Sequence, residues 1–192
     1  FPTRRSSDLT LPVFLNSIYT NAAGDKLAGH TNIVGNIYTS SDGGVTWVNR
    51  NSSVGAKEWY SMCLNAAGDK LAACATYDNG VVAANIYTSS DGGATWVNRA
   101  GPGTRQWRGI CSDATGDKLA ACPYSGNIYT SSDGGATWVD RASAGTRNWN
   151  SMCSDTTGNK LAACPSNGNI YTSSDGGANW VNRASAGTRN WY

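Results

Sequence analysis

The sequence lacks the features of several common protein classes. Of its 192 residues, 15 are Lys or Arg and 13 are Asp or Glu, and the cations are spread too evenly to form the basic stripe of a nucleic-acid reader. No apolar run reaches the roughly 18 residues of a membrane-spanning helix. Leu, Ile, Val and Phe are sparse, whereas Gly (23), Trp (8) and Tyr (9) are abundant, which favours short strands and tight turns. We therefore expect an all-β protein with no nucleic-acid partner and no membrane span.

The sequence does contain an internal repeat. Residues 107–148 and 149–190 are each 42 residues long and differ at only nine positions. The longer second unit has about six extra residues around 77–82 and one more before Trp59. An aspartate marks each of four units, with spacings of 49, 42 and 42 residues, at Asp42, Asp91, Asp133 and Asp175. The repeating unit is thus about 42 residues long.

Each unit has the pattern of a four-stranded sheet. In the last unit we expect strands at 149–155, 160–164, 169–172 and 179–183. Four short strands per unit of about 40–45 residues are typical of a propeller blade, and neighbouring blades must stack to bury a core. The predicted fold is an all-β β-propeller with four blades, at residues 11–50, 59–100, 107–142 and 149–184, and the start of a fifth at 191–192.

One segment per unit follows the pattern Ser-x-Asp-x-Gly-x-Thr-Trp, and we call this segment the aspartate turn. Asp at a turn accepts hydrogen bonds from backbone N–H groups just ahead of it, and Gly supplies the positive φ that the reversal requires. Only the fourth copy departs from the pattern, with Asn179 in place of Thr. The residues expected to build these turns are Ser40, Asp42, Gly44, Thr46, Trp47, Ser89, Asp91, Gly93, Thr95, Trp96, Ser131, Asp133, Gly135, Thr137, Trp138, Ser173, Asp175, Gly177 and Trp180.

These turns match the Asp box, so the chain resembles the BNR/Asp-box repeat propellers of the sialidase superfamily and the YVTN/BNR-like repeat proteins. The resemblance implies that the turns join the third and fourth strands of each blade, away from any active site. One carboxylate per turn falls short of the several oxygen ligands that Ca²⁺ takes, so neither a metal nor a cofactor is expected.

An enzyme is the weaker hypothesis. Similar sialidases use three arginines, a Tyr nucleophile with a Glu, and an Asp acid/base, whereas this chain has one Glu, Glu58, in a linker. Most of its aspartates recur in register, which is the behaviour of scaffold residues. The lone His30 has no accompanying nucleophile motif. We predict a non-catalytic scaffold that binds protein or glycan; the alternatives are a fragment of a sialidase or other glycoside hydrolase, and a structural repeat array of a large surface protein.

The six cysteines fall into pairs eleven residues apart: Cys63/Cys74, Cys111/Cys122 and Cys153/Cys164. The first unit replaces both members with Tyr19 and His30, which suggests that the two positions touch. A two-residue Gly-Asp turn would set Cys63 directly opposite Cys74. A three-residue loop fits the sequence better and would put the members of a pair on opposite faces of the sheet, where no disulfide can form. Free thiols are therefore favoured, and no Cys-x-x-Cys spacing indicates zinc.

A partner is expected at the end of the propeller opposite the aspartate turns. The loops between blades present Arg beside Trp, a composition typical of recognition surfaces. The inserted segment departs from the repeat, as functional loops often do. The alternative is that each Trp fills the gap between blades and each Arg caps it. The candidate binding residues are Tyr77, Asp78, Arg105, Trp107, Tyr124, Arg147, Trp149 and Arg189.

Both ends of the chain interrupt the repeat. Residues 1–9 resemble the translation of a short-read sequencing adaptor, and we set residues 1–10 aside as a non-native leader. The chain stops in mid-repeat at 191–192. We expect a fragment truncated at both ends, an open arc of a propeller of roughly six to eight blades, monomeric at full length and secreted or cell-surface in location.

Overall fold

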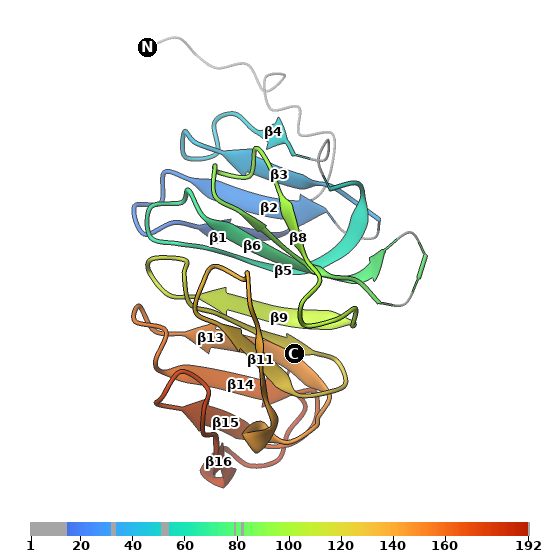
Figure 1. Ribbon diagram of the computed structural model, residues 1–192. Helices are drawn as coiled ribbons and strands as arrows, with labels where there is room; N and C mark the ends of the chain where they lie inside the picture. Colours follow the sequence, from blue (N-terminus) through green and yellow to red (C-terminus); the bar gives the residue numbers. More distant parts are fainter. Residues whose placement is uncertain (1–14, 32–33, 51–53, 79, 82, 192) are drawn as a thin grey trace.

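The computed structural model describes residues 15–31, 34–50, 54–78, 80–81 and 83–191. Within them the chain forms four antiparallel sheets of four strands, each with its strands in sequence order (Figure 1). The all-β, four-blade prediction is confirmed. The expected leader at 1–10 and residue 192 lie outside the described residues.

The strands match the expected pattern closely in every unit. The first blade contains β1 (Leu15–Thr20), β2 (Leu27–Thr31), β3 (Ile37–Ser40) and β4 (Val48–Asn49). The second contains β5 (Lys57–Leu64), β6 (Leu71–Asp78), β7 (Ile86–Ser89) and β8 (Val97–Arg99). The third contains β9 (Trp107–Ser112), β10 (Leu119–Pro123), β11 (Ile128–Ser131) and β12 (Val139–Arg141). The fourth contains β13 (Trp149–Ser154), β14 (Leu161–Pro165), β15 (Ile170–Ser173) and β16 (Val181–Arg183).

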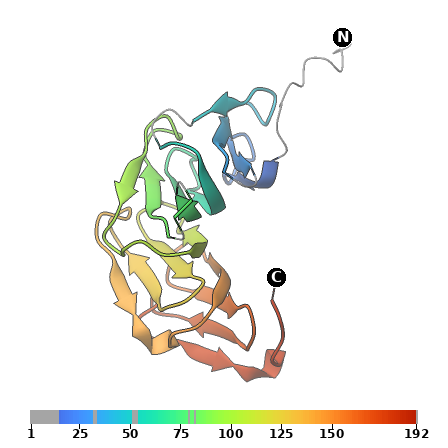
Figure 2. The same cartoon turned by 90° about the vertical axis from the view of Figure 1, so that its right-hand side faces the viewer.

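The blades stand side by side in an open crescent, with the first and fourth blades at its two ends (Figure 2). The first strand of each blade lies innermost, because β5 packs on β9 and β9 on β13. The expected open arc is therefore observed. The described helices are single 3-10 turns at Ala142–Ala144 and Ala184–Ala186, and none of them has the length or apolar character to cross a membrane.

The hairpin between the first two strands of each blade differs from our expectation. Cys63 pairs with Ala72, and Ser61 pairs with Cys74, because the loop has four residues rather than three. The two cysteines of a pair therefore share one face as diagonal neighbours, and the prediction of opposite faces is wrong. Diagonal residues are roughly 7–8 Å apart, beyond the reach of a disulfide. All six cysteines are free thiols, and burial raises the pKa of Cys63 to about 12.

The first blade fills the same diagonal position with two rings. Tyr19 and His30 stack with their ring centroids 6.3 Å apart, so the two replaced positions do touch. His30 is fully buried, and desolvation lowers the pKa of its imidazole. This histidine is part of the packing of the first blade.

The core consists of small residues in the second strand of each blade and large ones at the entrance to the first. The Ala-Ala-Cys run of β10, residues 120–122, is buried. Trp107 and Trp149 are fully buried, and each meets a tyrosine of its own blade edge to face, at ring-centroid distances of 5.6 and 5.5 Å. Small residues let strands approach closely, and one indole per blade fills the remaining volume.

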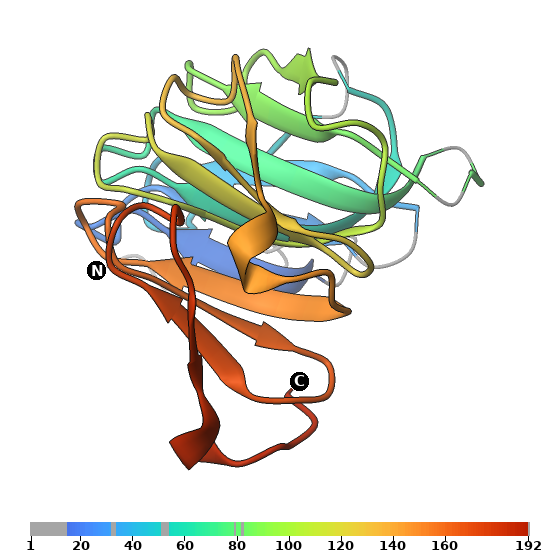
Figure 3. The same ribbon diagram turned by 60° about the horizontal axis from the view of Figure 1, so that its bottom comes forward.

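The inserted segment extends a hairpin rather than forming a free loop. Lys57 pairs with Asp78 and Glu58 with Tyr77, so β5 and β6 are longer than their counterparts. The extension projects beyond the other blades, in green at the right of Figures 1 and 3. Residues 79 and 82 of the insertion lie outside the described residues.

Candidate binding surface

The propeller has two chemically different rims. At one rim the hairpin turn and the aspartate turn of each blade lie together, because Gly43 N donates to Asp25 O and the equivalent bond recurs in the later blades. We call this the aspartate rim. The loops between blades and the loops before each third strand form the opposite rim, which we call the arginine rim.

The aspartate turns are closed networks. In the third blade, Ser131 Oγ donates to Asp133 Oδ1 at 2.8 Å, Gly135 N donates to Ser131 Oγ at 2.9 Å, and Thr137 N donates to Asp133 Oδ1 at 2.8 Å. Thr137 Oγ1 donates to the second carboxylate oxygen at 2.6 Å, and Trp138 Nε1 closes the turn on Gly135 O. The other three turns repeat this geometry, with Asn179 Nδ2 replacing the Thr hydroxyl in the fourth.

These hydrogen bonds favour the ionised carboxylate. The side-chain and backbone donors of Thr137 lower the pKa of Asp133 to about 2, and those of Thr46 do the same for Asp42. The carboxylates at these turns are already occupied by their own segment. The turns therefore stabilise the blade edge rather than offer open ligands.

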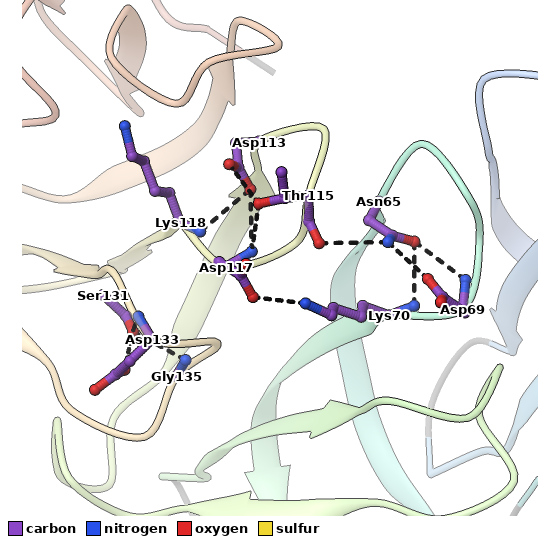
Figure 4. A network of polar contacts seen from close by, with 10 residues as sticks. All are labelled: Asn65, Asp69, Lys70, Asp113, Thr115, Asp117, Lys118, Ser131, Asp133 and Gly135. Carbon is purple, nitrogen blue, oxygen red and sulfur yellow. Dashed lines mark hydrogen bonds and ion pairs between the residues drawn. The ribbon is translucent and has the colours of Figure 1, made fainter.

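The aspartate rim also joins neighbouring blades (Figure 4). Lys70 Nζ of the second blade lies 2.6 Å from Asp117 Oδ1 of the third, and Asn65 Nδ2 donates to Thr115 O at 3.4 Å. Ala66 N donates to Ala114 O, and the same backbone bond links the other neighbouring blades. Repeated residues thus hold both the turn and the blade-to-blade junction.

The tryptophans of the candidate surface lie inside the molecule. Trp107 and Trp149 have no exposed surface, and Trp149 Nε1 donates to Gly126 O of the preceding blade at 3.1 Å. This supports the alternative in which each indole fills the gap between blades. The two indoles contribute to a binding surface only by supporting it.

The arginines of the same loops reach the surface. Arg105 lies over the Tyr129 ring at 4.9 Å from its centroid and donates to Tyr129 Oη at 2.6 Å. Arg147 lies over Tyr171 at 4.4 Å and is exposed, as is Arg189. Stacking on tyrosine fixes each guanidinium while leaving its other donors toward solvent.

Lys57 is a fourth cation equivalent to Arg105, Arg147 and Arg189, although it does not lie in an Arg-x-Trp sequence. Lys57 occupies the place of Arg105 at the junction of the first two blades, since Gly35 pairs with Lys57 as Ala84 pairs with Arg105. Its ammonium lies 5.1 Å from the Tyr87 ring centroid and 2.8 Å from Asp78 Oδ1. The inserted segment thus neutralises one cation of the rim through Asp78.

A cluster near the propeller axis was not predicted. Arg108 lies between two tyrosines, 4.4 Å from the Tyr124 ring centroid and 5.0 Å from that of Tyr60. Tyr60 Oη donates to Asn150 Oδ1 at 3.2 Å, which joins the second blade to the fourth. We call Tyr60, Arg108, Tyr124 and Asn150 the axial cluster; of the predicted residues it includes only Tyr124.

The signal for the axial cluster was present in the sequence. Of the nine positions at which 107–148 and 149–190 differ, three are consecutive at 108–110 and two are at 124–125. Those positions map to the innermost strand and to the neighbouring loop of the arginine rim. Of these five residues, Arg108, Tyr124 and Ser125 reach the surface, whereas Gly109 and Ile110 are buried. Tyr77 extends the same surface, because Gln106 Nε2 donates to Tyr77 Oη at 3.4 Å.

The comparisons with known proteins agree on the architecture. No family model matches the sequence, and no curated protein does either. The structure is similar to a GH74 enzyme of Niastella koreensis, with a TM-score of 0.67 and 19% identity over 90% of this chain and 25% of that one. It is similar to YCF48 bound to D1 peptide, with a TM-score of 0.66 and 18% identity over 96% of this chain and 59% of that one. It is also similar to a nidogen/laminin complex, with a TM-score of 0.64 and 14% identity over 82% of this chain and 59% of that one.

The chain is thus a β-propeller, the class of protein that these blades define, and it spans about a quarter of the GH74 structure and about three fifths of the other two. Identities this low show the fold alone. Enzymes and binding proteins both occur among the similar structures, so function must be argued from this chain's own residues.

Proposed function

We propose that this chain is a non-catalytic binding propeller whose arginine rim holds an acidic segment of a polypeptide. The observation that carries the proposal is Arg108. Its Nε is shielded from solvent and has no hydrogen-bond partner in the described structure. Its Nη1 makes two long contacts, 3.4 Å to Tyr60 Oη and 3.5 Å to Asn150 Oδ1.

A shielded guanidinium donor without a partner is costly, and an acceptor that reaches it is favoured. The two tyrosine rings restrict the plane of the Arg108 guanidinium and leave it short of good acceptors. A carboxylate matches the fork of an arginine with two parallel hydrogen bonds, which a neutral carbonyl cannot do. The axial cluster is therefore suited to an Asp or Glu side chain or a chain-terminal carboxylate.

The charges around the cluster favour the same ligand. Lys57, Arg105, Arg147 and Arg189 occupy equivalent places around the arginine rim, and among the described residues only Lys57 has a carboxylate within ion-pair distance. The aspartate rim carries nine aspartates and four lysines, at Asp25, Asp42, Asp69, Asp91, Asp113, Asp117, Asp133, Asp155, Asp175, Lys26, Lys70, Lys118 and Lys160. An acidic partner is attracted to one rim and repelled by the other.

The fold is compatible with this role. The similar YCF48 structure is a complex with D1 peptide, and the nidogen structure is a complex with laminin. Those partners belong to those proteins, and they support the proposal only by showing that propellers of this architecture bind polypeptides.

The test is binding of the 192-residue chain to an array of 12-residue peptides that differ in their number and placement of acidic residues. We expect acidic peptides to bind, and Arg108→Asn to weaken that binding about tenfold or more, since a charge-assisted hydrogen bond contributes about 1.5–3 kcal/mol. Blade four carries Asn150 at the same place, so this substitution suits the fold. Arg183→Ala, on an outer strand, is the control.

Two results would contradict the proposal. One is a chain that binds no acidic peptide. The other is acidic-peptide binding that Arg108→Asn leaves unchanged while the thermal unfolding midpoints of the variant and the parent agree.

A further inference from the structure

A second kind of site recurs between the blades, away from the axial cluster. Three clefts open between consecutive blades, with volumes of about 340, 220 and 220 Å³ along the chain. Each is lined by the outer strands of one blade and by both turns of the next. These volumes lie near or below the lower end of the roughly 300–1,000 Å³ of drug-sized pockets, so each cleft suits one ring-sized group.

The three clefts are built from the same side chains. In the middle cleft, Arg99, Val97 and Thr88 come from the second blade, and Asp133 and Gly134 come from the third. The corresponding sets in the other two clefts are Arg50, Val48, Thr39, Asp91 and Gly92, and Arg141, Val139, Thr130, Asp175 and Gly176. The repeat therefore produces one binding geometry three times.

The arginine of each cleft is held in place but not saturated. Arg99 Nε donates to Thr88 Oγ1 at 2.8 Å, and the bonds from Arg50 and Arg141 measure 2.8 and 2.7 Å. None of the three has a carboxylate within ion-pair distance among the described residues. Their terminal guanidinium nitrogens are thus oriented donors inside a cleft.

A serine supplies the acceptor of each cleft and a valine its apolar contact. Asp133 accepts four hydrogen bonds within its own turn and is saturated. The exposed Ser90 lines the middle cleft, and Ser41 and Ser132 line the other two, so a serine hydroxyl is the acceptor. Val97 is 50% exposed and Val139 likewise, which leaves a methyl surface between the donor and the acceptor. Donors, acceptors and an apolar contact at this scale match the hydroxyl edge and C–H face of a sugar ring.

The charges argue for a neutral ligand. The middle cleft is lined by two cations, Arg99 and Lys70, and by two carboxylates, Asp117 and Asp133. Lys70 and Asp117 form an ion pair (Figure 4). An anion would meet two carboxylates, and a cation would meet a guanidinium and an ammonium. A neutral polyol satisfies both signs through hydroxyl groups.

We propose that the three clefts between blades each bind one neutral sugar unit, so that the chain binds a repetitive neutral glycan through three equivalent sites. Multivalent contact raises the overall affinity by about 10²–10⁴ over a single site when the geometry allows simultaneous engagement. This site is independent of the proposed acidic-peptide surface, since the two use different residues at different rims.

The experiment is a glycan array of neutral and acidic glycans probed with the 192-residue chain, followed by calorimetry on the neutral glycan that binds best. We expect neutral glycans to bind. Replacing Arg50, Arg99 and Arg141 together by Ala should reduce the apparent affinity at least 100-fold, and a single Arg99→Ala should reduce the number of sites for a monosaccharide from three to two.

The chain contains a matched control. Arg183 Nε donates to Thr172 Oγ1 at 2.8 Å as in the other blades, but it lines a wider recess of about 550 Å³ that has no wall from a following blade among the described residues. Arg183→Ala should therefore leave sugar binding intact, and urea unfolding checks that this variant and Arg99→Ala are both folded. Arg108→Asn should also leave it intact.

Three results would overturn the proposal. The first is an absence of neutral glycan binding. The second is binding only to acidic glycans that salt abolishes, because that would reflect net charge rather than a cleft. The third is neutral binding that survives in the folded triple variant, because the site would then lie elsewhere.

Discussion

The two rims of this propeller are made by the same strands but treat their charged groups in opposite ways. At the aspartate rim, Asp133 and its equivalents are saturated by donors from their own turns. At the arginine rim, Arg147 and Arg189 are exposed, and Arg108 has a shielded donor without a partner. A carboxylate that its own turn has saturated stabilises the fold, whereas a guanidinium with spare donors at the surface can contact a ligand. The comparison assigns a scaffold role to the aspartate turns themselves and recognition to the arginines, both those of the arginine rim and those of the clefts between blades.

The largest expected effect distinguishes the buried tryptophan of the arginine rim from its exposed arginine. Trp149→Ala should lower the free energy of unfolding by about 3–5 kcal/mol, because the indole is fully buried against Tyr171. Urea unfolding followed by circular dichroism measures this change. Two residues away, Arg147→Ala should cost no more than about 1 kcal/mol, since an exposed cation–π contact contributes about 0.5–1 kcal/mol. Equal losses for the two variants would show that the rim is not divided into support and surface.

A smaller effect compares turns at the two rims. Gly116, at the aspartate rim, has φ +75°, and an added Cβ would lie 2.9 Å from Lys70 Cβ of the neighbouring blade. Gly103, at the arginine rim, has φ +79° and open space around it. Gly103→Ala should cost about 1–2 kcal/mol of backbone strain, and Gly116→Ala about 1–3 kcal/mol more from crowding. Thermal and urea unfolding of both variants test the difference. If Gly116→Ala costs no more than Gly103→Ala, the blades are not tightly packed at the aspartate rim.

The smallest expected effect is the pH dependence that the aspartate turns add below pH 4. The Thr137 donors lower the pKa of Asp133 from 3.8 to about 2, and the other three aspartate turns behave alike. A carboxylate whose pKa is depressed by folding stabilises the native state above pH 3.8, and this contribution is lost as the pH falls through about 2. Stability should therefore fall between pH 4 and pH 2, in addition to the loss below pH 6.5 that His30 causes because burial lowers its pKa.

Asp133→Asn should make this acid transition shallower, because the amide cannot titrate. Tryptophan fluorescence during acid titration follows the transition. A parent protein that loses no further stability between pH 4 and pH 2 would contradict this prediction.

Much of the fold could be predicted from the sequence, because the spacing of the repeated motif gives the length of each blade. The spacing of Asp42, Asp91 and the later aspartates set the blade length, and the strand positions followed from turns on either side. The hairpin register could not be read in the same way. A loop of three residues and a loop of four are both compatible with Ala-Ala-Gly-Asp, and one residue of difference moves Cys74 to the other face.

The candidate surface divided along the same line. The Arg-x-Trp pattern located the arginine rim. Residue type alone did not show that Trp149 is buried while Arg147 is exposed. Lys57 could not be predicted as an equivalent of Arg105, because the residue type differs and an insertion follows it. Arg108 could not be predicted because it occurs in one unit only, and the repeat pattern carries no information about such a position.

The sequence by itself determined the blade, its length, its strand order and the closed chemistry of the aspartate turns, because all of these depend on contacts within one repeating unit. Only the tertiary structure decided which side chains meet between blades. Tyr60 and Asn150 are 90 residues apart and touch because the first strands of successive blades converge on one axis. The clefts between blades exist for the same reason, since each is built half from one unit and half from the next.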